Sequence, residues 1–230
     1  MKQLLKKNKV WMMYGWTFQY KNGIQEEKGK KTSFERFDHF GNRTEEIYYD
    51  TKGNSSYECS FTYDVNGNEL KRMGEQGDEI IYDKWIYAFS DNGKKIEKRS
   101  EFKKAREEKW IFVYNENKNK VKETYYDVSG NISYNIELVY DHSNNLVEKK
   151  QTDAYGNIFK KWIYKYDAKG YNTEHLYCNN QLFRIYQLRY DKKGNLKSRF
   201  TLDANGEVIE LTVYIYQFYE GWHAPRTLRQ

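Results

Sequence analysis

The sequence predicts an all-β protein: an antiparallel β-meander of tandem hairpins, about 26 residues each, that forms one long, twisted or curled sheet. Three observations carry this prediction. An aromatic residue followed by Asp-x-x-Gly recurs along the chain, the residues between these strings alternate with a period of two, and aromatic residues make up 18% of the 230 residues. Aromatic side chains together with abundant Gly and Asn favour strands and turns over helices.

The recurring string is a predicted hairpin corner. Its Asp accepts hydrogen bonds from backbone N–H groups two residues on, and the Gly three residues after the Asp adopts φ > 0, which closes the hairpin. Asn144 replaces the Gly in one copy, and Asn also tolerates that conformation. Steps of 12 and 14 residues alternate, and such a period is typical of repeat architectures. The strings begin at Phe37, Tyr49, Tyr63, Tyr126, Tyr140, Tyr166 and Tyr190, and degenerate copies begin at Phe89, Tyr114, Thr152 and Leu202.

Three strand-like segments place rings on one face. Residues 85–89 (WIYAF), 110–114 (WIFVY) and 162–166 (WIYKY) each alternate aromatic residues with an Ile that points the other way. We expect most of these rings to form a thin core, and any that stay exposed to contact a ligand or a partner. The candidate binding surface comprises Trp85, Tyr87, Trp110, Phe112, Trp162 and Tyr164.

The chain reads as one domain with three parts. Residues 1–29 form a basic N-terminal segment with a possible first hairpin at Tyr20–Ile24, residues 30–219 form the repeat array, and residues 220–230 form a tail. The net charge is +6, and residues 1–31 carry all of this excess. A neutral array lacks the basic stripe of a nucleic-acid groove, so we expect no nucleic-acid partner. The basic segment is interpreted as a solubilising terminus, or alternatively as an arm for phosphates or anionic lipid.

The string Tyr-Asp-x-x-Gly-Asn, as in Tyr126–Asn131 and Tyr190–Asn195, resembles the YD-type repeats of bacterial RHS proteins. It is most similar to the short YD-repeat proteins common in Bacteroidetes, and residues 27–42 resemble the opening of such arrays. The resemblance implies an antiparallel strip with two unpaired edges, which charged side chains would guard. The large RHS shells enclose a toxin domain. This chain is too short for such a shell and lacks its proline-rich core motif, so encapsulation is not expected.

The sequence contains no catalytic, cofactor or metal signature. It has no His-x-x-x-His or Cys-x-x-Cys spacing and no phosphate-binding Gly loop, so we expect no enzyme activity, no cofactor and no metal. The corner aspartates are interpreted as turn caps, because calcium loops need several carboxylates within a few residues. Cys59 and Cys178 are expected to be free thiols.

The sequence also suggests no membrane span. No run approaches the roughly 18 apolar residues of a membrane helix, and the strands lack the long lipid-facing alternation of a membrane barrel. The absence of a signal peptide indicates the cytoplasm, with the envelope or secretion as the alternative if a leader precedes Met1.

Three functional hypotheses follow from these features. The favoured one is a non-catalytic scaffold that presents an extended sheet surface to a protein partner. The second is a carbohydrate-binding module that stacks a glycan on the aromatic face. The third is a glycan-active hydrolase that uses carboxylates such as Glu45 and Glu46, although neighbours in a strand face opposite ways.

Overall fold

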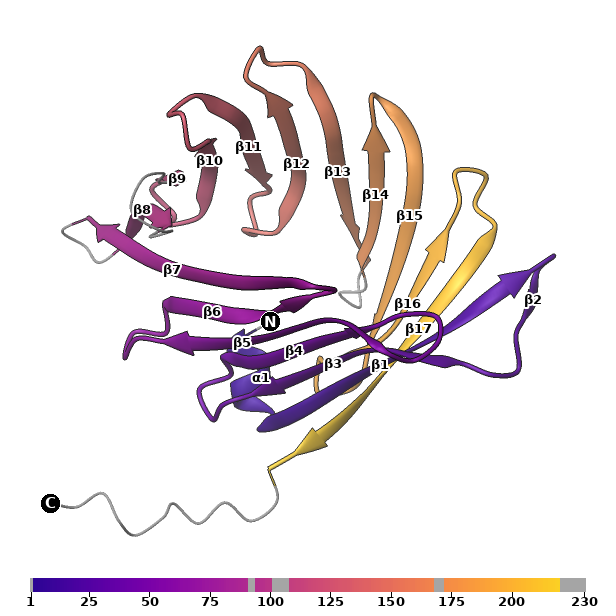
Figure 1. Cartoon of the computed structure of the whole chain (residues 1–230). Helices are drawn as coiled ribbons and strands as arrows, with labels where there is room; N and C mark the ends of the chain where they lie inside the picture. Colours follow the sequence, from indigo (N-terminus) through magenta and orange to yellow (C-terminus); the bar gives the residue numbers. More distant parts are fainter. Residues whose placement is uncertain (1, 91–93, 101–107, 168–171, 220–230) are drawn as a thin grey trace, which may run out of the picture.

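The chain forms a closed ring of antiparallel strands (Figure 1). The computed structural model describes residues 2–90, 94–100, 108–167 and 172–219. The predicted tail, residues 220–230, therefore lies outside the described residues. The elements are α1 (Lys2–Lys7), β1 (Val10–Lys21), β2 (Ile24–Gln25), β3 (Lys30–Phe37), β4 (Arg43–Tyr49), β5 (Ser55–Tyr63), β6 (Glu69–Gln76), β7 (Glu79–Phe89), β8 (Lys95–Ser100), β9 (Lys109–Tyr114), β10 (Lys120–Tyr126), β11 (Ile132–Tyr140), β12 (Leu146–Asp153), β13 (Ile158–Tyr166), β14 (Asn172–Cys178), β15 (Gln181–Tyr190), β16 (Leu196–Leu202) and β17 (Val208–Phe218).

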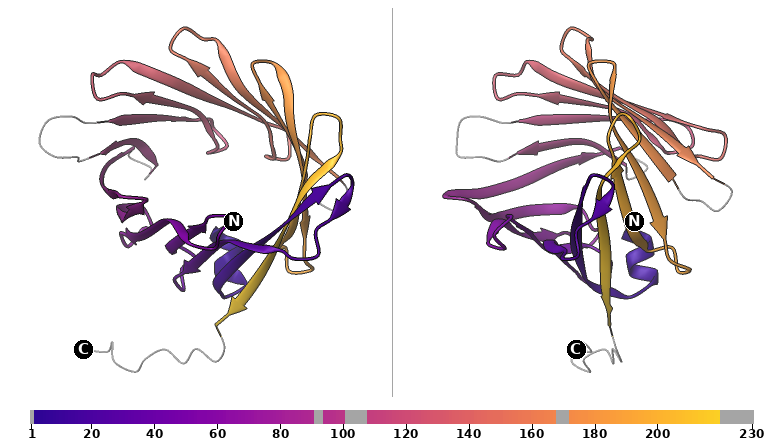
Figure 2. Two further views of the ribbon diagram at one scale, coloured as in Figure 1. Left: turned by 45° about the vertical axis from the view of Figure 1, so that its right-hand side comes forward. Right: turned by 90° about the vertical axis from the view of Figure 1, so that its right-hand side faces the viewer.

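The all-β antiparallel prediction is confirmed, but the sheet is closed rather than an open strip. From β3 to β17 each strand pairs with the next one in the chain, and β1 pairs with both β3 and β17. Sixteen strands thus complete the ring, since the two-residue β2 pairs only with β1. The predicted pair of free edges is wrong, because residues 10–21 supply the strand that covers both. Figure 2 shows the ring from two further sides.

Small inner residues build the closing seam. Thr17 lies opposite Thr212 across β1 and β17, and their hydroxyl oxygens are 3.3 Å apart. The Thr17 hydroxyl also lies 2.9 Å from that of Thr32, so a chain of hydroxyls crosses β1 from both sides. Thr17 and Thr212 are buried. At Gly15 a Cβ would lie only 2.4 Å from the Ser33 hydroxyl, which explains the absence of a side chain there.

The predicted corners that the structure describes are confirmed in detail, whereas those that begin at Phe89 and Tyr166 lie partly outside the described residues. At the first corner the Asp38 carboxylate accepts hydrogen bonds from the backbone N–H groups of Phe40 and Asn42, at 2.9 and 2.8 Å. Gly41 has φ of 76°, and its N–H donates to the Asp38 carbonyl. Asn144 takes the same left-handed conformation, with φ of 63°. The structure also explains the Asn that ends the string, because its side-chain amide donates to the second carboxylate oxygen of the Asp.

The tyrosine before many corners ties one hairpin to the previous one. The Tyr140 hydroxyl, at the end of β11, donates to the carbonyl of Lys120, which opens β10. In four other places the same link joins a tyrosine at the end of a strand, or two residues before it, to the first residue of the preceding strand. We call this set the tyrosine ladder: Tyr63 to Arg43, Tyr87 to Glu69, Tyr140 to Lys120, Tyr166 to Leu146 and Tyr216 to Leu196. All five links lie at one end of the barrel.

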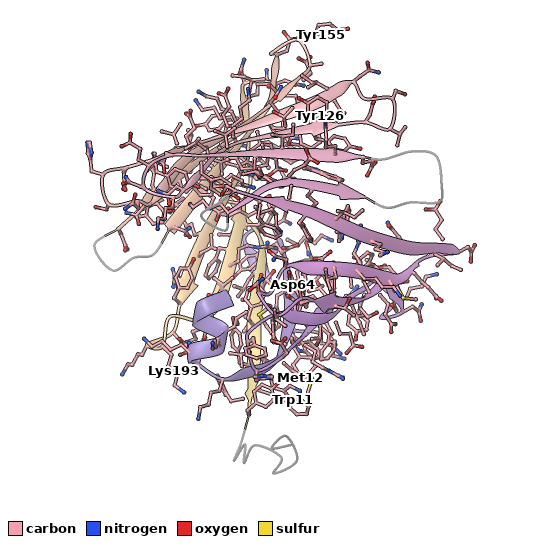
Figure 3. The ribbon with its side chains drawn as sticks, turned by 90° about the vertical axis from the view of Figure 1, so that its left-hand side faces the viewer. Trp11, Met12, Asp64, Tyr126, Tyr155 and Lys193 are labelled. Atoms are coloured by element: carbon pink, nitrogen blue, oxygen red, sulfur yellow. The ribbon has the colours of Figure 1, made fainter. Side chains whose placement is uncertain are left out.

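The helix α1 marks this end, which we call the helix end. Leu5 of α1 packs with Val10, Met13 and Phe37 in a buried cluster. The Asn8 side chain donates to the Lys193 carbonyl at 3.1 Å, which fixes the helix to the β15–β16 corner. Figure 3 shows Lys193 beside α1, and Tyr155 at the tip of a corner of the opposite end. The helix thus packs against the helix end through a buried apolar cluster and a hydrogen bond.

Alternating burial identifies the inner and outer walls. In a barrel, successive residues of a strand point alternately inside and outside. In β11 the side chains of Ile136 and Leu138 are partly buried, whereas Glu137 and Val139 are exposed. The same alternation holds in β15, and the strand register carries each face around the ring. The face that contains Ile136 and Leu138 is therefore the inner wall.

Removing the Tyr140 hydroxyl tests the tyrosine ladder. Tyr140→Phe leaves the Lys120 carbonyl without this donor, so we expect the free energy of unfolding to fall by about 1 kcal/mol. Tyr126→Phe is the matched control, because the Tyr126 hydroxyl has no hydrogen-bond partner among the described residues. Urea denaturation followed by tryptophan fluorescence measures both. Equal destabilisation by the two changes would contradict the ladder.

Candidate functional site

All six predicted surface residues point into the barrel. Trp85 and Tyr87 of β7, Trp110 and Phe112 of β9, and Trp162 and Tyr164 of β13 belong to the inner wall by register. Trp85 is 7% exposed, and the other five are partly buried. The predicted aromatic face thus exists, but it lines the interior instead of an outer surface.

The structure brings two of the predicted tryptophans together and leaves the third apart. The Trp85 and Trp110 ring centroids lie 5.4 Å apart, edge to face. Two further aromatic side chains continue this row. The ring centroids of Trp110 and Tyr125 lie 4.9 Å apart, and those of Tyr125 and Tyr134 are separated by the same distance. Trp162 lies on β13, further around the ring. Tyr125 is directly paired with both Trp110 and Tyr134, so the ordinary spacing of neighbouring strands accounts for the two 4.9 Å steps.

Lysine amines cover the faces of these rings. The Lys98 amine lies 3.3 Å from the centre of a Trp85 ring, and the Lys149 amine lies 4.4 Å from that of Trp162. A cation placed over a ring face contributes roughly 0.5–2 kcal/mol, most when water is excluded. These ring faces are therefore occupied by the protein's own cations.

A buried carboxylate pair on β3 and β4 escaped the sequence analysis. Glu35 and Glu46 lie directly opposite each other on the inner wall. The Arg43 guanidinium contacts both carboxylates, at 3.6 and 2.5 Å, and the Tyr48 hydroxyl donates to Glu46. Burial raises the pKa of Glu35, and the nearby Glu46 adds to this effect although Arg43 opposes it. One arginine thus forms ion pairs with two glutamates at a poorly solvated position on the inner wall.

A second charged cluster lies on the wall of β12–β16. Lys149, Glu174 and Arg199 come from three strands, and the register places Glu174 beside Tyr164 and Tyr186. Burial raises the pKa of Glu174, while the charges of Arg199 and Lys149 oppose that rise. Burial also lowers the pKa of Lys149. None of the three forms a direct ion pair with another of them among the described residues.

Arg199 carries a polar atom without a partner. Its Nε is buried and makes no hydrogen bond, although one terminal nitrogen lies 3.8 Å from the Glu210 carboxylate. Buried donors are normally satisfied, so such an atom needs a reason. The cluster of Lys149, Glu174 and Arg199, which we call the β12–β16 cluster, therefore combines half-solvated charges with an unused donor.

Water reaches the inner wall. The side chains of Glu35, Glu123 and Arg199 remain 18%, 14% and 39% exposed, although all three point inward. In a packed core these values would approach zero. Sixteen strands make a barrel wide enough to leave an aqueous interior. The inner wall thus lines a solvated space.

Two parts of the outer wall differ in character. On β12 and β13 it carries ion pairs, with Glu148 held 2.7 Å from Lys150 and 3.1 Å from Lys161. On β16, β17, β1, β3 and β4 it is mainly apolar. This apolar outer sector consists of Phe200, Leu211, Val213, Ile215, Tyr14, Trp16, Phe18, Phe34, Ile47 and Tyr49. The Lys31 amine lies over three of its rings, so the sector is not free of charge.

Other kinds of site were sought in the described part of the chain. Within it, no group of three or more His, Cys, Asp and Glu residues is placed to hold a metal ion. Cys59 is a buried free thiol, and Cys178 is a half-buried one. None of the helices there has the length and apolar character needed to cross a membrane.

Comparisons with known proteins find no family for this chain. No family model matches it, and no curated protein matches it. Among solved structures, a porin-like protein from Bacteroides uniformis is 10% identical with a TM-score of 0.36, covering 91% of this chain and 97% of that one. A porin-like protein from Bacteroides vulgatus is 9% identical with a TM-score of 0.35, covering 88% and 97%.

A third solved structure, TcdB2-TccC3 without its hypervariable C-terminal region, is 11% identical with a TM-score of 0.23. The match covers 79% of this chain and 14% of that one. All three TM-scores lie below 0.5, so these likenesses assign neither a fold nor a function. The resemblance to YD-type repeats stays a prediction.

The structure corrects the predicted function. A scaffold with an extended sheet surface needs an open strip. The sheet is instead closed into a barrel, and the predicted aromatic side chains face its interior. The carbohydrate-binding alternative fails because lysines cover the tryptophan faces inside the barrel. The hydrolase alternative fits no better, since Glu45 belongs to the outer wall and Glu46 to the inner one.

The predicted partners need the same correction. A protein partner and a glycan were both expected on the open face that the barrel does not have. The expectation of no membrane span rested on the absence of a long apolar run and of long lipid-facing alternation in the strands. Closed barrels are the β architecture that can span a membrane, because closure leaves no unpaired edge. That expectation therefore no longer stands.

The effect of the Glu174 charge on stability can be compared with that of the Glu148 charge, because folding shifts their pKa values in opposite directions. Folding raises the pKa of Glu174 above 4.5, so its ionised form destabilises the fold, and this penalty vanishes at lower pH. Glu174→Gln should therefore raise the Tm at pH 7.5 by about 2–4 °C, as expected for about 1 kcal/mol, and change nothing at pH 4.

Glu148→Gln is the matched control with the opposite sign. The hydrogen bond from Lys150 holds the pKa of Glu148 below 4.5, and Lys161 adds to this effect. This carboxylate stabilises the fold above pH 4.5, and the stability is lost as the pH falls. The control should lower the Tm at pH 7.5 and have a smaller effect at pH 4, because the stabilisation is lost only as the pH falls through the lowered pKa of Glu148. Differential scanning calorimetry at both pH values measures the pair, and equal signs at pH 7.5 would contradict the assignment.

Proposed function

We propose that the protein works through its interior, as a barrel that admits small water-soluble molecules and holds them against the inner wall. The observation that carries the proposal is the closed ring around a wall whose inward charges stay partly solvated. A packed core needs no charged residues, and buried charges without direct partners are costly. A wall that meets water and solutes accounts for both.

The barrel supplies what a solute chamber needs. Rigid strands hold the side chains in fixed positions, and ligand sites favour a few convergent polar groups among apolar and aromatic ones. The inner wall offers this mixture, with the row from Trp85 to Tyr134 on one side and the β12–β16 cluster on another. The corners lie at the two ends of the barrel, so they do not interrupt the hydrogen-bonded strands that form its wall.

Thiol labelling tests whether small solutes enter while large ones do not. In a variant with Cys59→Ala and Cys178→Ala, Leu176→Cys places a thiol on the inner wall. Gln187→Cys places one on the exposed outer wall of the neighbouring strand and serves as the control. We expect the small reagent N-ethylmaleimide to label both positions.

A maleimide on a polyethylene glycol chain of several kilodaltons should label the outer position, and the inner one on the order of tenfold more slowly. Mass spectrometry over time gives both rates. If the large reagent labels both thiols equally, the ring is open. If N-ethylmaleimide fails to label the inner thiol, solutes do not enter. Either result overturns the proposal.

A membrane pore is a second candidate, favoured by the closed ring and by the apolar outer sector. Lipid contact in this case would be confined to that sector, because the outer walls of β12 and β13 carry paired Lys and Glu. Lys and Arg on a lipid-facing wall cost about 2–4 kcal/mol each at the bilayer centre. Several copies would then have to turn their charged walls toward one another.

Bilayer recording tests this candidate. The protein is added to a planar bilayer of mixed zwitterionic and anionic lipid, and we expect stepwise conductance that scales with salt concentration. The variant Val213→Asp puts a charge in the apolar outer sector and should abolish insertion, whereas Gln187→Asp, outside the sector, should not. Absence of steps, or equal insertion by both variants, would reject a pore.

A further inference from the structure

The helix α1 lies on the inner side of the barrel wall. Leu5 packs into a buried cluster whose other members come from β1, β3 and β17. By register, the side chains that border it from β1 and β17 belong to the inner wall: Val10, Met13, Tyr214, Tyr216 and Phe218. Figure 2 shows α1 at the rim of the ring, beside the ends of these two strands. A helix that packs on inward-facing side chains covers part of the opening that the strands enclose.

Side chains at the end of α1 reach two separate corners of the rim. The Asn8 amide donates to the Lys193 carbonyl at 3.1 Å and to the Asn195 side chain at 2.7 Å, both in the β15–β16 corner. The Lys6 amine lies 5.6 Å from the Phe40 ring in the β3–β4 corner. Strands β16, β17, β1 and β3 lie between these corners in the ring. The end of α1 therefore bridges an arc of the rim instead of following a single strand.

The junction with β1 holds the helix in this place. Lys9 has φ of 54°, which is uncommon for a residue other than glycine, and its N–H donates to the Lys6 carbonyl. The Lys9 carbonyl accepts a hydrogen bond from the N–H of Tyr219 at 2.9 Å, just after β17. The chain thus reverses between α1 and β1, so α1 turns back over the mouth.

The two mouths of the barrel differ as a result. At the helix end, a cavity of about 800 Å³ remains between Lys6 and the β3–β4 and β5–β6 corners, with Phe40, Phe61 and Asp64 among its lining residues. The helix therefore narrows this mouth without filling it. Among the described residues, the opposite end consists of corners and the connections around β2, and no helix lies across it.

We propose that α1 is a plug that narrows the barrel at the helix end, so that small solutes reach the inner wall mainly through the opposite end. This inference rests on the proposed function, because it assigns the route by which solutes enter. Leu5 is the apolar anchor of the plug, and Asn8 is its polar anchor. Both anchors are separate from the pairing of β1 with β3 and β17, which closes the ring.

Thiols at two levels of the inner wall test the route of entry. In the variant with Cys59→Ala and Cys178→Ala, Leu188→Cys reports on the inner wall of β15 near the helix end. Leu176→Cys reports from a level further toward the opposite end, where it pairs with Arg184. We expect a maleimide on a short polyethylene glycol chain to label position 188 several-fold more slowly than position 176. The small reagent N-ethylmaleimide should label both.

Release of α1 should remove this difference. Leu5→Asp places a charge in the buried cluster, which is costly, and should raise the labelling rate at position 188 to that at position 176. Lys7→Ala makes the same change in net charge at an exposed position of the same helix, so it should leave both rates unchanged. Asn8→Ala keeps the apolar anchor and should give an intermediate rate, which carries the test if Leu5→Asp fails to fold.

The results separate the plug from the chamber. If N-ethylmaleimide labels neither inner thiol, the proposed function fails. If it labels both, but the longer reagent already labels the two positions at equal rates before α1 is altered, only the plug inference fails. The plug inference also fails if Leu5→Asp and Asn8→Ala leave the slow rate at position 188 unchanged, or if Lys7→Ala raises it as much as they do.

Discussion

The structure depends on the pairing of β1 with two strands that are far apart in the sequence. Without β1, strands β3 to β17 would form a strip with two bare edges, and such edges attract other chains. The register joins Val10 to Phe218 and Gly15 to both Tyr214 and Ser33. This pairing gives the sheet an inside and an outside. Every property of the inner wall follows from it, because an open strip would expose both faces to bulk water.

The seam and the repeat place different demands on the chain. Each repeat closes locally, because its corner supplies its own hydrogen bonds and its tyrosine reaches only to the previous strand. The seam instead joins residues about 200 positions apart, so it carries most of the loop-closure entropy. Contacts this distant in sequence slow folding. Small residues at Gly15, Thr17 and Thr212 let the strands approach closely, and the helix α1 adds the apolar cluster around Leu5 beside them.

Local features were predictable from the sequence, and closure was not. The corner at Asp38 follows from chemistry within five residues, and so does the alternation of WIYKY in β13. The segment that closes the ring carries no Asp-x-x-Gly string, so its partners leave no local signal. Nor does alternation say which face is inside. The rings of Trp85 and Trp162 were correctly placed on one face, but only closure shows that this face is internal.

The charged clusters are invisible along the chain for a related reason. Lys149, Glu174 and Arg199 lie about 25 residues apart, one repeat from each other, and only the register places them on a common wall. One signal was available. Counting by twos from Trp162 keeps Tyr164 on the ring-bearing face, but Lys149 and Arg199 join that face only through the register across the corners. Charged residues on a face that is otherwise aromatic are unusual for a core.

The mixed wall follows from the same geometry. A barrel of sixteen strands is too wide for its side chains to meet across the centre, so its inner rings cannot bury both faces against other rings. A ring left with one face toward water gains from a cation laid over it, as Lys98 lies over Trp85 and Lys149 over Trp162. Each such lysine stabilises the wall and also brings a positive charge into the interior. Where carboxylates balance these charges, as around Arg43, the wall is neutral. Where they do not, along β12–β16, the wall that stabilises the barrel keeps an excess of positive charge.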